Sequence, residues 1–375
     1  MHKSFIISII LILGLALLTG CGSDTQDTDT TQKTFTLGAV APLTGDGAAY
    51  GLPTQKVIEA AVLDVNKKWA DAGKKYMLDL YFEDGKCNPK DGLTAAQNLV
   101  NLRGVKVIYG GLCSGETLGL APFANAQKVI AFSALSSSPD ITNAGDYIFR
   151  NYPSDTAQVA AVMKKIKKDG PKKIAILSEN TDYVQALRRG YKAVFQQEGI
   201  QLVGDEVIES SVKDLRTELL KIKSSNPDAV ILIPQTIPMG EIMVKQYTES
   251  GIEATVYSGE VLGLGEVIDK QGSLMEGFYS VRAKFNENNN EFLKLKARTG
   301  CDLGIYCITT YDGIFLLAEL FEECGEDTQC LKKNLYDTKN WRGFTGASYS
   351  FDSNGDVAGE FEVFQITNGE TVVVN

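Results

Sequence analysis

Short apolar runs alternate with longer amphipathic stretches along most of this chain. The apolar runs are rich in Val, Ile, Leu and Phe and predict β-strands, while the stretches between them carry apolar residues at helical spacing. In the segment from about 51 to 69, for example, Ile58, Val62, Val65 and Trp69 are spaced to lie on one face of a helix. Regular alternation of strand and helix predicts a parallel sheet with helices on both faces.

The alternation occurs twice, so we predict an α/β fold made of two doubly wound units in series. The rhythm of the first unit restarts after Tyr152. The predicted strands are 35–41, 76–82, 105–109 and 129–132 in the first unit and 173–177, 201–208, 229–233 and 254–258 in the second; the predicted helices are 51–69, 94–103, 118–127, 157–168, 184–197, 215–224 and 239–250; an extended segment at 277–283, helical structure over 291–336 and strands at 347–351, 361–367 and 371–374 complete the chain.

Two small polar clusters follow neighbouring strands of the first unit. Cys113-Ser114-Gly115 comes after the strand at 105–109, and Ser136-Ser137-Ser138 comes after the strand at 129–132. Ligands of doubly wound sheets bind beyond the carboxyl ends of the strands, where hydroxyl and backbone N–H groups suit a small anion such as a carboxylate. A serine-rich turn is the alternative, and on this segment alone it is the more common explanation.

Glu260 holds a comparable position in the second unit. It follows the strand at 254–258 and precedes Val261-Leu262-Gly263, a stretch that we expect to pack near the crevice between the units. A carboxylate in that place could balance a partly desolvated ammonium group. The alternative is an acid at a helix N-terminus that faces solvent.

The chain begins with a predicted targeting segment. Lys3 precedes an apolar run at 5–18, which is too short for a confident membrane span. The following Leu18-Thr19-Gly20-Cys21 resembles the lipobox of bacterial lipoproteins, so we expect residues 1–20 to be a lipoprotein signal peptide and Cys21 to be lipidated. An ordinary secretory signal is the alternative. Residues 21–33 are polar and predict a flexible tether.

Composition excludes several classes of function. The chain carries 37 Lys and Arg against 47 Asp and Glu, a net charge of −10 that becomes −11 once Lys3 is removed with the signal. This balance argues against nucleic acid as a partner. His2 is the one histidine of the sequence and lies in the signal, which excludes a histidine-based triad or zinc site from the mature protein. No nucleophile motif is present, so we predict that the protein is not an enzyme and uses no cofactor.

Seven cysteines include Cys21, so six remain, an even number in an exported chain. Their spacing favours disulfides over metal ligation, because no zinc-type C-x-x-C pair is present. The predicted disulfide pairs are Cys87–Cys113, whose members end neighbouring strands, and Cys301–Cys307 and Cys324–Cys330, each six residues apart.

The run at 352–356 begins like a calcium loop but lacks the glycine and the glutamate that such a loop needs. We therefore interpret it as a hairpin turn and predict no metal site.

The motifs GAVAPLTGDGAAYG, EDGKCNPKDG, GGLCSGET and SALSSSPDITNAGDYIFR together resemble the type I periplasmic binding proteins of branched-chain amino-acid ABC importers. The resemblance covers the chain from about residue 34 to its end. It implies two Rossmann-like lobes joined by three hinge strands, with the ligand in the cleft between them and the 87–113 disulfide beside it. The implied ligand-binding residues are Tyr50, Ser114, Ser136, Ser137, Tyr183 and Glu260, with Ser114 at the ligand carboxylate and Glu260 at its ammonium group.

The resemblance also implies a domain division and departures in specificity. Hinges are expected near Tyr152, near 279–282 and near 346–348. Lobe 1 would then comprise 34–151 and 283–345, and lobe 2 would comprise 152–282 and 346–375. The chain departs from the family pattern at Tyr183-Val184 and at Gln235-Thr236-Ile237, where leucine-type binders have a further aromatic residue. The Gln and Thr could favour a smaller or more polar amino acid.

The function implied is capture of a small, aliphatic or branched-chain amino acid outside the cell and its delivery to an ABC permease. The protein is expected to be a monomer, exported and held at the outer face of the cytoplasmic membrane, or in the periplasm, by lipid on Cys21. An amide-, urea- or short-peptide-binding protein and a ligand-sensing receptor component of the same fold are the alternatives. An exported hydrolase is disfavoured by the missing histidine.

Overall fold

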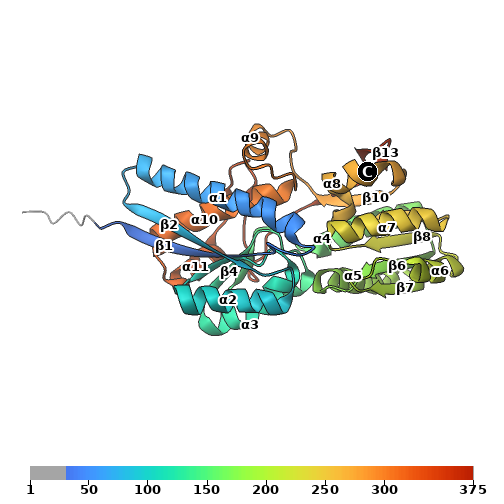
Figure 1. The fold of residues 1–375 in the computed structure, drawn as a ribbon, viewed down its shortest axis with the longest axis horizontal. Helices are drawn as coiled ribbons and strands as arrows, with labels where there is room; N and C mark the ends of the chain where they lie inside the picture. Colours follow the sequence, from blue (N-terminus) through green and yellow to red (C-terminus); the bar gives the residue numbers. More distant parts are fainter. Residues whose placement is uncertain (1–30, 375) are drawn as a thin grey trace, which may run out of the picture.

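Two open sheets, each flanked by helices, form two lobes that lie end to end (Figure 1). The structure is a computed structural model that describes residues 31–374, so the predicted signal peptide, Cys21 and most of the predicted tether lie outside the described residues. The architecture confirms the predicted α/β fold with two parallel-sheet lobes.

The first lobe is built on a five-stranded parallel sheet in the order β2-β1-β3-β4-β5. Helices α1 and α10 lie on one face of this sheet, while α2 and α3 lie on the other (Figure 1). The strands are β1 (Lys33–Ala41), β2 (Tyr76–Asp84), β3 (Val107–Gly110), β4 (Ile130–Ser133) and β5 (Ile148–Arg150), and the helices are α1 (Ala48–Asp71), α2 (Pro89–Arg103), α3 (Ser114–Gln127), α9 (Asn290–Thr299), α10 (Ile305–Cys324) and α11 (Thr328–Asp337), with the 3₁₀ turn η1 (Pro139–Asn143).

The second lobe is built on a seven-stranded sheet in the order β14-β13-β10-β9-β8-β6-β7. It is parallel from β7 to β10, and β13 and β14 extend it as antiparallel strands. Its elements are α4 (Asp155–Asp169), β6 (Lys173–Glu179), α5 (Asp182–Glu198), β7 (Gln201–Ile208), α6 (Arg216–Ser224), β8 (Ala229–Ile233), α7 (Ile237–Ser250), β9 (Thr255–Ser258), η2 (Glu260–Gly263), α8 (Gly265–Gln271), η3 (Gly272–Leu274), β10 (Tyr279–Ala283), β13 (Phe361–Thr367) and β14 (Glu370–Val373).

The parallel parts of the two sheets share one topology. The order β2-β1-β3-β4-β5 in the first lobe matches the order β7-β6-β8-β9-β10 in the second. In each lobe the strand order reverses beside the first strand, between β1 and β3 and between β6 and β8. The crevice at the carboxyl ends of the strands at such a reversal is the place where doubly wound folds bind ligands.

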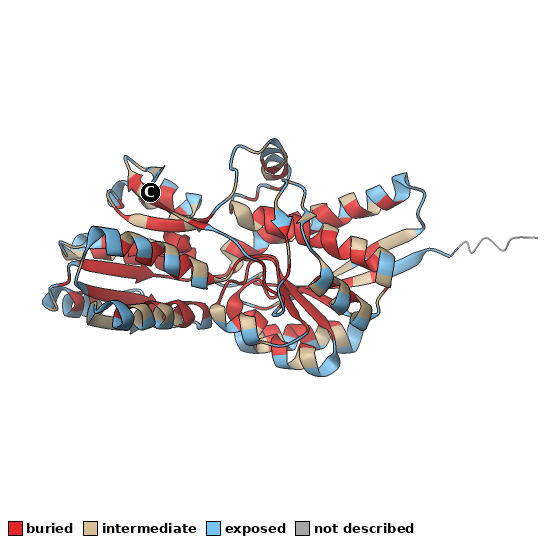
Figure 2. Cartoon of the chain, turned by 180° about the vertical axis from the view of Figure 1, so that it is seen from behind, coloured by how far each residue is buried: buried red, intermediate tan, exposed pale blue. Residues whose placement is uncertain are grey.

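Burial follows the hydrophobic pattern of the sequence. Strands β3, β4, β5 and β8 are buried along their whole length, because helices cover both faces of each sheet. Figure 2 shows the buried strands inside both lobes and the exposed residues on the outer sides of the helices. Helices α2 and α3 begin four or five residues earlier than predicted, at Pro89 and Ser114, because Asn88 caps the first and Glu116 supports the first turn of the second.

The three predicted disulfides are confirmed. Cys87 bonds Cys113 and so joins the loop after β2 to the start of α3. Cys301 precedes α10 and bonds Cys307, which lies in the first turn of that helix. Cys324 bonds Cys330 between the end of α10 and α11. Each bond therefore holds together segments that flank a turn.

The third connection between the lobes differs from the prediction. The segment at 346–348 is not a hinge, because Ser348–Tyr349 forms strand β12, which pairs with β11 (Trp341–Arg342) beside the first lobe. Phe351 then packs its ring against Phe132 and Phe149 of that lobe. The chain therefore crosses to the second lobe only before Phe361, where β13 begins. The prediction was wrong here because the sequence pattern does not show which lobe the apolar residue Phe351 packs against.

The other two connections between the lobes are short. The first runs from the end of β5 at Arg150 to the start of α4 at Asp155, and it includes Tyr152. The second leaves β10, which is still a strand of the second sheet, after Ala283. Lys284 N–H then donates to the Glu360 carbonyl at 2.8 Å, so the second and third connections lie side by side.

A buried ion pair fastens the third connection to the first lobe. Arg150 is fully buried, and its Nε and Nη2 atoms each lie 2.7 Å from a different carboxylate oxygen of Asp356. Nη1 donates to the Ser138 carbonyl at 2.8 Å, and Nη2 also contacts the Thr142 hydroxyl at 3.0 Å. One guanidinium group thus joins the end of β5, the serine loop and the third connection.

Replacing Asp356 with Asn should lower the free energy of unfolding by about 3–5 kcal/mol, because it leaves the buried Arg150 charge unpaired. The matched control is Asp71→Asn, which breaks the exposed Lys67–Asp71 pair and should cost less than about 1 kcal/mol. Urea unfolding followed by tryptophan fluorescence measures both, since Trp69 lies in α1 and Trp341 in β11, which are elements of the first-lobe side. Equal losses in the two variants would contradict the role assigned to Arg150.

Candidate ligand-binding cleft

The carboxyl ends of the strands of both sheets meet between the lobes and enclose a cavity of about 50 Å³. The first lobe contributes the loops after β3 and β4 and the start of α1, while the second contributes the segments after β6, β8 and β9. The lining residues are Tyr50, Leu112, Cys113, Ser114, Leu135, Ser137, Tyr183, Gln235, Val261 and Tyr306. Four of the six residues predicted to bind ligand therefore surround one buried space.

Ser114 and Ser137 provide neutral donors on the first-lobe side. Both are buried at 3% exposure, and the Ser114 hydroxyl accepts the Ser138 N–H at 3.2 Å, which ties the two loops together. Ser114 is the first residue of α3, so the unpaired N–H groups and the positive end of the helix dipole lie beside its hydroxyl. This combination suits a carboxylate.

Ser136 is placed differently from its neighbour. Its hydroxyl donates to the Gly111 carbonyl at 2.7 Å and lies 2.8 Å from the Thr117 hydroxyl. These partners occupy the hydroxyl, and Ser136 does not line the cavity. Ser136 therefore links the loop after β4 to the loop after β3 by hydrogen bonds.

Glu116 and the 87–113 disulfide hold the loop that carries Ser114. The fully buried Glu116 carboxylate accepts the backbone N–H of Cys87 at 2.9 Å and that of Cys113 at 3.0 Å. Burial raises the pKa of Glu116 to about 8, although these hydrogen bonds oppose the shift. A carboxylate and a covalent bond therefore fix the same turn, which pre-positions the donors at the start of α3.

The lobes touch across the cleft, so this is a closed arrangement. Tyr50 of α1 donates its hydroxyl to the Gln235 carbonyl of the second lobe at 2.8 Å. Gln235 in turn places its side-chain amide 2.8 Å from the Cys87 sulfur. At the surface, Arg189 of α5 forms an ion pair with Asp140 of η1 at 2.5 Å. Tyr50 and Tyr183 are consequently buried, one from each lobe.

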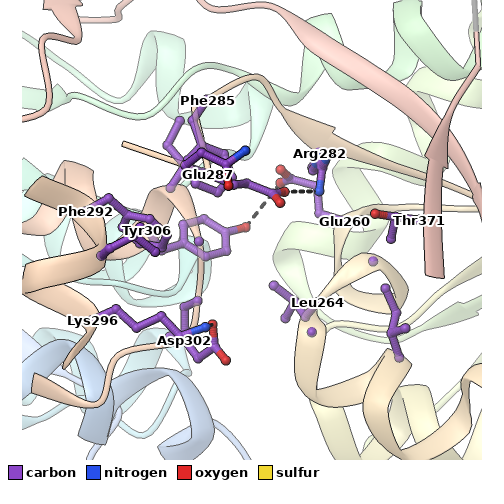
Figure 3. A pocket seen from close by; sticks show the side chains of 18 of the residues that line it. Glu260, Leu264, Arg282, Phe285, Glu287, Phe292, Lys296, Asp302, Tyr306 and Thr371 are labelled. Carbon is purple, nitrogen blue, oxygen red and sulfur yellow. Dashed lines mark hydrogen bonds and ion pairs between the residues drawn. The ribbon is translucent and has the colours of Figure 1, made fainter. Parts of the chain in front are cut away.

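Glu260 lies at the end of β9 and is 4% exposed. Its carboxylate accepts hydrogen bonds from the hydroxyls of Tyr152 and Tyr306, the latter at 3.1 Å, and from the Ala283 N–H at 3.2 Å. All three partners are neutral. Burial, together with the negative charge of the nearby Asp155, raises the pKa of Glu260 to about 8. Glu260 does not line the 50 Å³ cavity but faces a larger one (Figure 3). Tyr306 is a lining residue of both cavities.

Sequence reasoning missed a second buried acid beside this site. Asp155 opens α4, and its backbone N–H donates to the Ser137 carbonyl at 2.9 Å. Its Oδ2 atom has no hydrogen-bond partner among the described residues, and neither has Oε1 of Gln158, which lies against Gly259. Burial raises the pKa of Asp155. In the sequence, Asp155 is an ordinary first-turn acid after the N-cap Ser154, so no pattern marks it.

Two orphaned buried acceptors next to Glu260 need donors, because an unpaired buried polar atom costs about 1–3 kcal/mol. A ligand with a cationic donor group would supply them.

The sequence analysis also missed Tyr306 as a cleft residue. It falls within a long predicted helical segment, and only the fold brings its ring to the cleft. Within residues 31–374, no group of three or more metal-binding side chains gathers, and no helix has the length and apolar character to cross a bilayer.

A two-lobed α/β protein that encloses a donor-lined cavity between its lobes is, by class, a ligand-binding protein that works by domain closure. The comparison with known families agrees, since the model described as periplasmic binding protein matches residues 34–371. The chain belongs to the periplasmic binding protein family. This family consists of binding proteins rather than enzymes.

Curated relatives match along nearly their whole length. The Leu/Ile/Val-binding protein homolog 3 of Brucella melitensis is 26% identical over 347 residues, which cover 90% of this chain and 93% of the relative. The leucine-, isoleucine-, valine-, threonine- and alanine-binding protein of Pseudomonas aeruginosa is 25% identical and covers 88% and 90%. Among solved structures, a leucine-binding protein from Thermotoga maritima superposes with a TM-score of 0.80 at 21% identity, covering 91% of this chain and 98% of that one.

Proposed function

We propose that this protein captures a free amino acid outside the cytoplasm and delivers it to an ABC permease. The observation that carries the proposal is the pairing of neutral donors with an uncompensated acid. Ser114 and Ser137 line one side of the closed cavity, and Glu260 stands behind Tyr306 with only neutral partners. An α-amino acid offers a carboxylate for the first group and an ammonium for the second. The names of the relatives support the same ligand class.

Recognition would follow from the cost of desolvating two charges. In the closed cleft the ligand carboxylate exchanges water for the hydroxyls of Ser114 and Ser137 and the N–H groups at the start of α3. Its ammonium exchanges water for Glu260 and for the free acceptors of Asp155 and Gln158. Each charge needs such partners, because a buried and unpaired ion is strongly unfavourable. The rings of Tyr50 and Tyr183 cover the remainder of the ligand from either lobe.

Delivery would depend on the same closure. Contacts that join the lobes, such as the Tyr50 hydroxyl with the Gln235 carbonyl, form only when the cleft is shut. A ligand that bridges both lobes therefore favours the closed state, and the closed state is the form that we expect the permease to receive. One chain is sufficient for this function, and we propose that the protein acts as a monomer.

A thermal-shift screen tests the ligand class. Leucine, isoleucine, valine, threonine and alanine form the test set, and acetamide, urea and a dipeptide form the comparison set. A ligand at about one hundred times its Kd stabilises the folded protein by about 2.7 kcal/mol, so at least one free amino acid should raise the Tm clearly. A shift with amides or urea and none with amino acids would overturn the proposal.

The pKa of Glu260 predicts a pH-dependent affinity. Below about pH 8 the free protein holds a proton on Glu260 that an ammonium ligand must displace, so affinity should rise from pH 6 to pH 8 and then level off. For a single coupled proton the rise is at most about tenfold per pH unit. Calorimetry at pH 7 in buffers of different ionisation enthalpy should detect release of most of one proton.

Glu260→Gln is the matched variant for that experiment. It should abolish the proton release and weaken binding by about 30-fold to several thousandfold, which corresponds to the roughly 2–5 kcal/mol lost when one partner of a buried pair is removed. Glu266→Gln, at an exposed acid on α8, is the control and should change neither quantity. Unchanged affinity in a folded Glu260→Gln protein would remove Glu260 from the site.

We further propose that Cys21 carries lipid and anchors the protein at the membrane surface. The support is the Leu18-Thr19-Gly20-Cys21 motif directly after the apolar run. Cys21→Ser should move the protein from the membrane fraction to the soluble fraction, and intact-mass measurement of the native protein should find acyl chains on Cys21. Native protein that begins at another residue, or carries an unmodified Cys21, would disprove the anchor.

A further inference from the structure

A strongly basic run lies in the second lobe of this acidic chain. Residues 164–173, KKIKKDGPKK, hold six lysines against one acid, Asp169, which pairs with Lys165. The run therefore carries +5, and because the whole chain carries −10, the remainder carries −15. It covers the end of α4 and the start of β6, and five of its six lysines are exposed. Positive charge is thus concentrated on one part of the surface.

Three lysines of this run line a surface hollow of about 350 Å³ between α4 and the strands β13 and β14. Lys164, Lys165 and Lys168 are spaced to lie on one face of α4, which forms one wall. Lys284, which follows β10, also lines the hollow. The other side is apolar and is formed by Phe361, Val363, Val373 and Val374. We call this feature the lysine hollow.

Acids do not neutralise the lysine hollow. Glu362 is the one acid that the described residues place in its lining, and its carboxylate already accepts the Arg282 Nε at 2.8 Å. Lys284 pairs with Glu360 at 2.7 Å, but both side chains are more than half exposed, so this pair contributes little. Four ammonium groups therefore surround the hollow with a surplus of positive charge.

An apolar surface beside several ammonium groups suits an anionic amphiphile. Val372 and Val373 of the edge strand β14 are 51% and 46% exposed, so they extend the apolar surface outward. A phosphate group would contact the ammonium groups, while the valines and the methylene stems of the lysines would contact the apolar part next to that phosphate. Charge alone would suit any anion, whereas charge next to exposed valines suits a phospholipid.

The proposed lipid anchor places a bilayer within reach. Ten residues, 21–30, precede the described chain, and an extended segment of that length spans at most about 35 Å. This segment leads into β1, which belongs to the first lobe. An anchor there attaches only the first lobe to the membrane. The lysine hollow lies in the second lobe and would supply the missing contact.

We propose that the lysine hollow binds anionic phospholipid headgroups and holds the second lobe against the membrane surface. The proximity of the bilayer rests on the anchor at Cys21 proposed above, whereas headgroup binding itself depends neither on that anchor nor on the amino-acid ligand. The contact is electrostatic and reversible, so salt weakens it. It orients the protein and does not replace the anchor.

Vesicle flotation tests the docking with the mature chain, residues 21–375, carrying Cys21→Ser, so that acyl chains cannot cause binding. Vesicles of phosphatidylglycerol and phosphatidylcholine in equal parts are compared with vesicles of phosphatidylcholine alone. At low ionic strength the protein should float with the anionic vesicles and not with the neutral ones. Binding should be lost in 1 M salt, where the Debye length is about 3 Å. Flotation with neither vesicle, or equally with both, would overturn the docking.

A matched pair of double variants locates the contact. Lys164→Gln with Lys168→Gln should weaken binding to the anionic vesicles at least about tenfold, since each lysine near an anionic surface contributes about fivefold. Lys67→Gln with Lys333→Gln is the control, because it removes the same charge from two exposed lysines of first-lobe helices. The control should change binding less than about twofold. Equal losses would contradict the proposal, since binding would then follow net charge alone.

A tryptophan variant tests contact with the apolar surface. Emission from Val373→Trp should move to shorter wavelength when anionic vesicles are added, because the ring then leaves water. Leu63→Trp, on the exposed face of α1, is the control and should show no such shift. A shift in neither variant, with the protein bound, would exclude the valines from the contact and overturn the assignment to this hollow.

Glycerol 1-phosphate separates a lipid surface from a soluble phosphate. At the phosphate concentration of the vesicles it should leave flotation unchanged, because it lacks the apolar part and the high charge density of a bilayer. Complete displacement would show a site for a soluble anion and would overturn the membrane as the occupant. If the vesicles do not bind but the Lys164 and Lys168 variant still slows amino-acid uptake by cells, the lysines contact a protein such as the permease and the proposal is wrong. The thermal-shift screen tests the amino-acid ligand separately from all of these results.

Discussion

The buried Arg150 guanidinium is the constraint on which the cleft depends. It ends the last strand of the first sheet, and its N–H groups make four hydrogen bonds, to the carboxylate of Asp356, the carbonyl of Ser138 and the hydroxyl of Thr142. Through these bonds one side chain sets the path of the serine loop and the point at which the third connection leaves the lobe. A fully buried cation needs such a complete set of partners, so none of these segments can move independently.

The cleft itself is built on an imbalance of charge. On the first-lobe side, the serine hydroxyls and the start of α3 offer donors without a formal charge. On the second-lobe side, Glu260 and Asp155 are buried acids whose described neighbours do not neutralise them fully, which is the reason that both have a raised pKa. Closing the lobes without a cation between these acids carries a free-energy cost. A ligand that supplies an ammonium removes that cost, so ligand charge and lobe closure are coupled.

The sequence by itself determined the architecture and most of the chemistry at the strand ends. Periodicity identified the two α/β units, the even cysteine count and its spacing identified all three disulfides, and the positions after the strands predicted the serine clusters that contain Ser114 and Ser137. These features follow from local rules, because a strand, a turn or a six-residue disulfide loop involves neighbours along the chain. Local pattern even singled out Glu260, although it could not say which distant groups surround the carboxylate.

Only the tertiary structure decided the rest, since it depends on which distant residues surround a side chain. Residues 346–351 stay with the first lobe because Phe351 finds Phe132 and Phe149 there, a contact that no local pattern encodes. Ser136 and Ser137 are identical and adjacent in the sequence, yet Gly111 and Thr117 occupy one hydroxyl while the other faces the cavity. Asp155 becomes a buried acid only because the lobes place it beside Glu260. Burial and charge environment are long-range properties, and they separate a binding group from an ordinary residue of the same type.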